Sequence, residues 1–259
     1  MLFPIADEND DRRSTPWANY ALILINLFVF VFLQGLGSND RFTYAFSTVP
    51  AEIINGRDIV TPDRIVIEPI TGQRVAIPGL QPTLIPVWLT LITSMFMHGG
   101  IAHIFGNMLF LWIFGDNIED RLGHIRYLIF YLVCGVLAGL APVFSSAIFA
   151  GDNAGSLLVP SLGASGAISG VLGAYILLFP TKRVTVLLSW FVTQVPAFIA
   201  IGLWFVFQLI SGLGVLGKDS QQGGVAYAAH IGGFIAGLAL IKIFEIGRPR
   251  ANEYSPPGY

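Results

Sequence analysis

The sequence has few charged residues, a single cysteine and no excess of positive charge. Charged residues make up 12% of its 259 positions and hydrophobic residues 54%, and the mean hydropathy is +0.70. These values lie outside the range of soluble domains, so the composition predicts a polytopic membrane protein. The net charge of −2 argues against a nucleic-acid partner, because no basic face is available to neutralise phosphates.

Thiolate and metal chemistry have little support in the sequence. The single cysteine, Cys134, can form neither an internal disulfide nor a thiolate cluster, and it is expected to fill space in an apolar run. His98 and His103 are five residues apart, a poor match for one helix face, so no metal is expected. No histidine is followed by glutamate, which excludes the HExxH zinc-protease motif.

Two further hydrolase patterns are also missing. The G-x-S-x-G elbow of α/β-hydrolases is absent around Ser165, because position 167 is alanine. The segment IFGDN at 113–117 lacks the earlier glycine of the Gly-x-Gly-Asp pattern of intramembrane aspartyl proteases. All sixteen Asp and Glu residues fall in tails, loops or the helix ends expected to be cytoplasmic.

Long apolar stretches dominate what is present. Helices able to cross a hydrocarbon core of about 30 Å are expected at six places: about 17–36, 101–115, 126–149, 162–179, 184–210 and 226–246. The expected fold is therefore an all-α membrane bundle over 17–246, with tails at 1–16 and 247–259. The first stretch is too long for the core of a signal peptide, so an uncleaved anchor is expected.

The loops predict an orientation and some local structure. If the amino terminus is cytoplasmic, nine of the fourteen basic residues lie on the inner side, so the positive-inside rule places both termini in the cytoplasm. The long outer loop 37–100 is expected to contain a hairpin over 64–78, with its turn at Thr71-Gly72, and an interfacial helix over about 86–98.

Polar residues inside the apolar stretches are costly and need a reason; those that stand out are His103, Asn107, Ser165 and His230. Counted at about 1.5 Å per residue from Pro180, Ser165 lies roughly 22 Å up its helix. Counted from the inner end of each helix, the rise is roughly 20 Å for His103, 14 Å for Asn107 and 18 Å for His230. The helices expected at 101–115, 162–179 and 226–246 all run from the outer side of the membrane to the inner side. Their polar residues are therefore expected in one layer.

Small residues accompany this layer. Gly166 and Gly170 form a small-xxx-small pair beside Ser165, and AHIGGFIAG places His230 and Gly237 on one helix face. Such faces allow close helix contact in lipid. A serine in this setting can serve packing alone, and a lone histidine can be structural or part of a proton pathway.

The coincidence in depth favours acyl transfer over packing alone. A serine hydroxyl needs a base, and imidazole is suited to that role. His103 and Asn107, four residues apart, supply donors for a developing oxyanion, to which the backbone amide of Ser165 could add. Because no carboxylate lies nearby, a Ser-His dyad is expected rather than a triad.

These segments resemble the motifs of the rhomboid family of intramembrane serine proteases. GASG (163–166) resembles its G-x-S-G motif, HIFGN (103–107) its H-x-x-x-N, and AHIGGFIAG (229–237) its A-H-x-x-G-x-x-x-G. EDRLG (119–123) is similar to its acid-Arg-Gly turn, and the resemblance spans roughly 15–245.

The resemblance implies that Ser165 is the nucleophile and His230 the general base, with His103 and Asn107 as oxyanion-hole groups and Gly163 shaping the site. It also implies a six-helix core with a water-filled cavity open to the outer face, and no cofactor. The implied partners are the lipid bilayer and transmembrane protein substrates, and the implied location is a bacterial inner membrane. The alternative is a non-catalytic rhomboid-like protein that binds transmembrane helices; a transporter is weaker, because no ion-binding carboxylate is evident.

Some features depart from the family pattern. Some members carry arginine after the tryptophan of the first-loop helix, whereas Trp88 is followed by Leu89. Some place an aromatic residue one turn below the nucleophile; here Ser169 occupies that position, which predicts a second hydroxyl in the site and leaves the group that orients His230 unidentified. Pro196 is expected to interrupt the fifth helix, either as a static kink or in a mobile element that admits substrate laterally.

Overall fold

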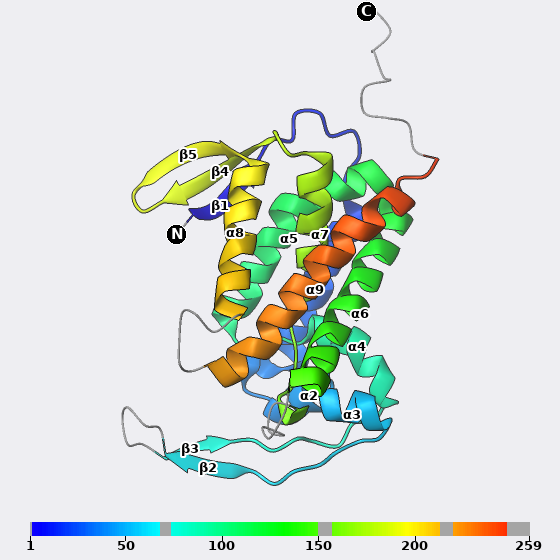
Figure 1. Cartoon of the computed structure of the whole chain (residues 1–259), viewed down its shortest axis with the longest axis vertical. Helices are drawn as coiled ribbons and strands as arrows, with labels where there is room; N and C mark the ends of the chain where they lie inside the picture. The colour runs from blue at the N-terminus through cyan, green and yellow to red at the C-terminus, as the bar shows by residue number, and fades with distance from the viewer. Residues whose placement is uncertain (1, 68–73, 150–156, 213–219, 248–259) are drawn as a thin grey trace, which may run out of the picture.

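The computed structural model describes residues 2–67, 74–149, 157–212 and 220–247. Its apolar helices lie side by side along the long axis of the molecule (Figure 1). They are α1 (Trp17–Phe28), which continues as a π-helical turn over Val29–Leu33, and α5 (Ile101–Leu122), α6 (His124–Phe149), α7 (Ser165–Leu178), α8 (Ala197–Gly212) and α9 (Ser220–Phe244). The predicted all-α membrane bundle is confirmed.

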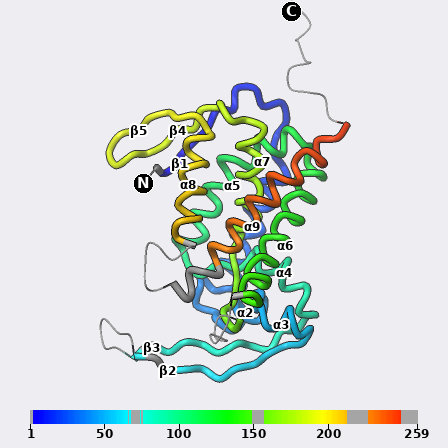
Figure 2. The backbone as a smooth tube through the Cα atoms, viewed as in Figure 1, coloured from blue at the N-terminus to red at the C-terminus, as the bar shows by residue number. Residues whose placement is uncertain are grey.

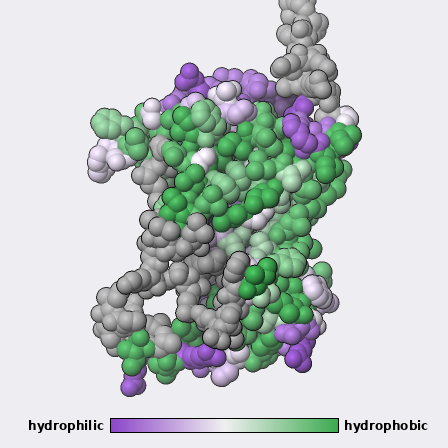
Figure 3. Space-filling view, in the orientation of Figure 1, coloured by the Kyte–Doolittle hydropathy of each residue, from purple (hydrophilic) through white to green (hydrophobic). Residues whose placement is uncertain are grey.

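The bundle has the length and composition of a multi-pass membrane protein. Among the described helices, three are long and apolar enough to cross a membrane: Ile101–Leu122, His124–Ile148 and Ala226–Phe244. Shorter apolar helices accompany them, among them Trp17–Leu33, Ser165–Leu178 and Ala197–Ser211. A total of six crossing helices stays a prediction. Figure 3 shows the hydrophobic flank of the bundle, with hydrophilic side chains gathered towards its ends.

The prediction of one helix over 184–210 is wrong. Arg183–Leu188 (β4) and Phe191–Pro196 (β5) form an antiparallel hairpin, and Leu2–Asp7 (β1) pairs with β4 to complete a sheet of order β1-β4-β5. The β-branched residues in these segments favour strands. Pro196 ends β5 directly before α8 begins, so it does not kink a helix as expected.

The long first loop lies at the opposite end of the molecule from this sheet (Figure 2). It contains a turn of 3-10 helix over Gly35–Gly37, then α2 (Asp40–Ala45) and α3 (Pro50–Asn55). The predicted hairpin is confirmed, because β2 (Arg64–Ile67) and β3 (Arg74–Ile77) pair antiparallel; its expected turn at 71–72 lies outside the described residues. The expected interfacial helix consists of three short helical pieces: Val87–Leu89, α4 (Thr90–Thr93) and Ser94–Phe96.

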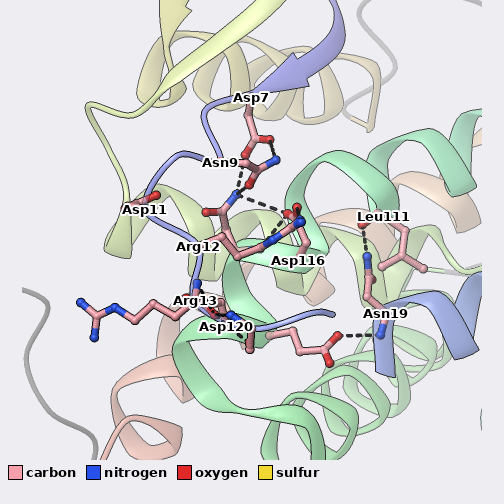
Figure 4. A network of polar contacts seen from close by, with 12 residues as sticks. Asp7, Asn9, Asp11, Arg12, Arg13, Asn19, Leu111, Asp116 and Asp120 are labelled. Atoms are coloured by element: carbon pink, nitrogen blue, oxygen red, sulfur yellow. Dashed lines mark hydrogen bonds and ion pairs between the residues drawn. The ribbon is translucent and has the colours of Figure 1, made fainter. Parts of the chain in front are cut away.

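Polar contacts bind the segment before α1 to the far end of α5 (Figure 4). Arg12 forms an ion pair with Asp116 at 2.7 Å, and Asp120 accepts two backbone N–H groups from the same segment at 3.0 and 2.7 Å. Asp7 accepts a hydrogen bond from the Tyr175 hydroxyl at 2.7 Å. Burial raises the pKa of Asp7 to about 7. The residues before α1 are thus part of the folded domain.

Glu119 holds the start of α1. Its carboxylate is fully buried; it accepts the backbone N–H groups of Ala18 at 2.9 Å and Asn19 at 2.6 Å and contacts the ring of His124. The first N–H groups of a helix have no partner within the helix, so this carboxylate satisfies two of them and matches the positive end of the helix dipole.

Replacing Glu119 with leucine is expected to lower the free energy of unfolding by about 1–3 kcal/mol, because buried N–H groups lose their acceptor. Thermal unfolding in detergent micelles measures this change. Glu119→Gln keeps an acceptor of the same length and is expected to lose less. Equal stability of the wild type and Glu119→Leu would refute the capping role.

Candidate active site

Ser165 is the first residue of α7, and its position depends on the turn before the helix. Gly163 has a φ of +118°, which L side chains rarely adopt, and its N–H donates to the carbonyl of Ser94 at 2.9 Å. A Cβ at Gly163 would lie 2.8 Å from the ring of His103. Glycine thus allows the chain to turn into α7 directly against that histidine.

Ser165 and His230 form a direct contact across the α7–α9 interface. The Oγ of Ser165 lies 2.7 Å from Nε2 of His230. The backbones behind them nearly touch, because a Cβ at Gly233 would lie 2.0 Å from the carbonyl oxygen of Gly166. The small faces expected from the sequence therefore bring the two helices close enough for a hydroxyl to donate to the imidazole.

His103 contributes a donor on the same side of the site. The Gly99 N–H donates to its Nδ1 at 3.3 Å. In a neutral imidazole one nitrogen accepts and the other carries the proton, so this contact leaves the proton on Nε2. Gly163 lies beside that nitrogen, and His103 can therefore donate into the space next to Ser165.

Asn107 lies one turn further along α5 and is buried, and its Nδ2 has no hydrogen-bond partner. A buried, unpaired donor costs free energy unless a ligand satisfies it. A cavity of about 160 Å³ lies at this level of the bundle. Asn107 is not among the residues of its wall, which include Ser94, His103, Pro160, Gly163, Ser165 and His230.

The prediction that Ser169 adds a second hydroxyl to the site is wrong. Its Oγ donates to the carbonyl of Ser165 at 2.6 Å, and the residue is fully buried within α7. A serine inside a helix often makes this bond to the residue four positions earlier. The hydroxyl is therefore used within the helix.

The group that contacts the other side of His230 was not among the predicted site residues. The Oε1 of Gln208, on α8, lies 2.7 Å from Nδ1 of His230, and the ring of Trp204 lies 6.0 Å from the histidine ring. The signal was present, because Gln208 is a polar residue within the apolar stretch GLWFVFQLI. Its contact with His230 was not predicted, because the segment was expected to be one helix over 184–210, whereas α8 begins at Ala197.

Within the described part of the chain, no three His, Cys, Asp or Glu side chains gather as metal ligands. What the residues do provide is a serine in contact with an imidazole, a second imidazole with a free donor, and a buried amide. This set of groups, in a helical membrane bundle, has the composition of an acyl-transfer site.

The family model of the rhomboid domain matches residues 86–245. The chain belongs to the rhomboid family. The matched region begins with the expected interfacial segment and includes Ser165 and His230.

Relatives of this chain are also named as rhomboid proteins. "Rhomboid protein 1, mitochondrial" of Saccharomyces cerevisiae is 31% identical over 159 residues, 61% of this chain and 42% of that protein. "Rhomboid protease GluP" of Bacillus subtilis is 33% identical over 168 residues, 64% of this chain and 28% of that protein. "RHOMBOID-like protein 4" of Arabidopsis thaliana is 26% identical over 257 residues, 95% of this chain and 58% of that protein. The chain thus spans less than two thirds of the length of these relatives.

Proposed function

We propose that this protein is an intramembrane serine endopeptidase that cleaves transmembrane segments of membrane proteins. The observation that carries the proposal is the 2.7 Å contact between Ser165 Oγ and His230 Nε2 on the wall of a cavity that His103 also lines. A purely structural serine needs no imidazole partner of this kind. The name of the Bacillus relative, a rhomboid protease, is consistent with this activity.

The reaction assigns a step to each group. Ser165 Oγ attacks the scissile carbonyl while His230 Nε2 takes its proton, and His230 then protonates the leaving amine. His103 Nε2–H donates to the oxyanion, and the free amide of Asn107 adds a second donor as the site closes on substrate. A water molecule then hydrolyses the acyl-enzyme, with His230 again as the base. These groups require no cofactor.

The same geometry supports a proposal for the substrate and for the orientation. An apolar flank on the bundle favours a substrate that arrives through the lipid, a transmembrane helix. Most basic residues of the described chain, among them Arg12, Lys182 and Lys242, belong to or flank the start of α1, the junction of α5 and α6, and the ends of α7 and α9. These helix ends lie opposite the β2-β3 hairpin (Figure 1), so we propose that this end of the bundle and both termini are cytoplasmic. A bacterial inner membrane stays a prediction, since the named relatives include a mitochondrial protein and plant proteins.

A serine-reactive fluorophosphonate probe tests the proposal. The purified protein in lipid vesicles is expected to become labelled, to cleave a single-pass membrane substrate, and to yield a modified peptide that contains Ser165. Ser169→Ala serves as the matched control and should label as the wild type does. Labelling lost in Ser169→Ala but retained in Ser165→Ala would move the nucleophile, and a folded wild type that neither labels nor cleaves would favour the non-catalytic, helix-binding alternative.

A further inference from the structure

We propose that Gln208 is a positioning residue that sets the tautomer and orientation of His230. This role deepens the proposed function and rests on it. Its geometric basis is a relay of two contacts across three helices: Gln208 Oε1 to His230 Nδ1 at 2.7 Å, and His230 Nε2 to Ser165 Oγ at 2.7 Å. The relay places one hydrogen bond on each nitrogen of the imidazole.

The two contacts together determine where the proton sits. A neutral imidazole has one N–H and one bare nitrogen, and the base must present the bare nitrogen to Ser165. The Oε1 of Gln208 can only accept, so it selects the form with the proton on Nδ1 and leaves Nε2 free. The opposite tautomer would present an N–H to the serine and could not take its proton.

Gln208 is suited to this role because it is buried. Gln208 is 6% exposed, whereas its neighbours on α8, Phe207 and Leu209, are 43% and 36% exposed. A buried amide costs free energy unless it is hydrogen-bonded, so its contact with His230 is strongly favoured. In Ser-His-Asp triads a carboxylate holds the histidine; here a neutral amide holds it, and no charge has to be buried.

The relay also makes base orientation depend on α8. Ser165 and His230 lie on α7 and α9, which pack backbone to backbone, whereas Gln208 and Trp204 reach the histidine from α8. A hydrogen bond weakens beyond a donor–acceptor distance of about 3.2 Å, so a small outward shift of α8 removes the constraint. The Ser-His contact can then persist while the imidazole is free to change tautomer. Cleavage is therefore expected only when α8 packs against α9 closely enough for Gln208 to contact His230.

Variants at Gln208 test this role by kinetics. Gln208→Leu fills the same space without an acceptor and is expected to lower kcat about 100-fold, the lower end of what a general base contributes, with KM unchanged. Gln208→Glu restores an acceptor and should recover most of the rate. Because a carboxylate favours a charged imidazole, the acidic limb of its pH–rate profile should move to higher pH. Phe207→Leu, on the lipid-facing side of the same helix, controls for general effects on α8.

A spectroscopic measurement separates this proposal from the proposed function. The chain has four histidines, so the 15N signals of His230 can be assigned by their loss in His230→Asn. The wild type should show a protonated Nδ1 and a bare Nε2, and Gln208→Leu should show a mixture, whether or not the protein cleaves any substrate. An unchanged tautomer in Gln208→Leu would overturn the positioning role. So would an equal loss of kcat in the leucine and glutamate variants with no change in pH profile.

Discussion

Ser165→Ala is expected to reduce kcat/KM for a transmembrane substrate by about 10⁴-fold or more, as removal of the nucleophile does in other serine hydrolases. The methyl side chain leaves the α7–α9 contact intact, so the protein should fold as the wild type does. His230→Ala should cause a loss of similar size, because the serine is a weak nucleophile until the imidazole takes its proton. The measurement is initial-rate cleavage in lipid vesicles, with thermal unfolding to verify the fold.

The double variant sharpens this prediction. Residues that act as one unit show strongly non-additive effects, so Ser165→Ala combined with His230→Ala should be no worse than either change alone. Ser169→Ala is the matched control and should keep its rate within about tenfold, because its hydroxyl bonds to a backbone carbonyl outside the reaction. Additive losses in the double variant would mean that the two residues act independently, which contradicts a dyad.

Gly237→Val is expected to abolish activity and to destabilise the fold at the same time. A Cβ at Gly237 would lie 2.0 Å from the carbonyl oxygen of Gly170. Gly170 lies on α7 and Gly237 on α9, and their backbones are in close contact at this point. A branched side chain must push the helices apart, at a cost of about 1–3 kcal/mol or more. The same separation breaks the hydrogen bond between Ser165 and His230.

Gly202→Val provides the control for Gly237→Val. Gly202 lies inside α8, and a Cβ there would have no neighbouring atom within 4 Å. The two variants therefore share the same change in helix propensity, because glycine is replaced by valine inside a helix in both, whereas only Gly237→Val disturbs an interface. Thermal unfolding in micelles and probe labelling of Ser165 measure the effects. Equal behaviour of the two variants would show that the α7–α9 contact does not build the site.

The juxtaposition of Ser165 and His230 was predictable because it depends on regular quantities. A helix rises by a fixed amount per residue, so counting from polar ends gives depth, and small-residue faces indicate which sides can meet. The close backbone contact at Gly233 and Gly237 is the three-dimensional result of that pattern. The main features of the bundle follow from the same regularity.

The environment of His230 was not predictable in the same way. The segment 184–196 is apolar and rich in β-branched residues, a pattern that fits a membrane helix and a pair of strands equally well. The sequence therefore did not predict that α8 begins at Ala197. Without the correct start, the direction in which Gln208 points cannot be obtained from helix periodicity. Ser169 shows a similar limit, because the sequence does not tell whether a hydroxyl faces a cavity or its own backbone.

The β1-β4-β5 sheet has a consequence for biosynthesis. Its register pairs Phe3 with Leu187 and Asp7 with Val184, so the residues of β1 are synthesised about 180 positions before the residues with which they pair. By then the segments of α1, α5, α6 and α7 have all been synthesised. Because β5 ends at Pro196 and α8 begins at Ala197, formation of this sheet fixes the amino-terminal end of α8. We therefore expect the amino-terminal strand to remain accessible to protease on nascent chains that end before Arg183 and to become protected only once the hairpin is complete.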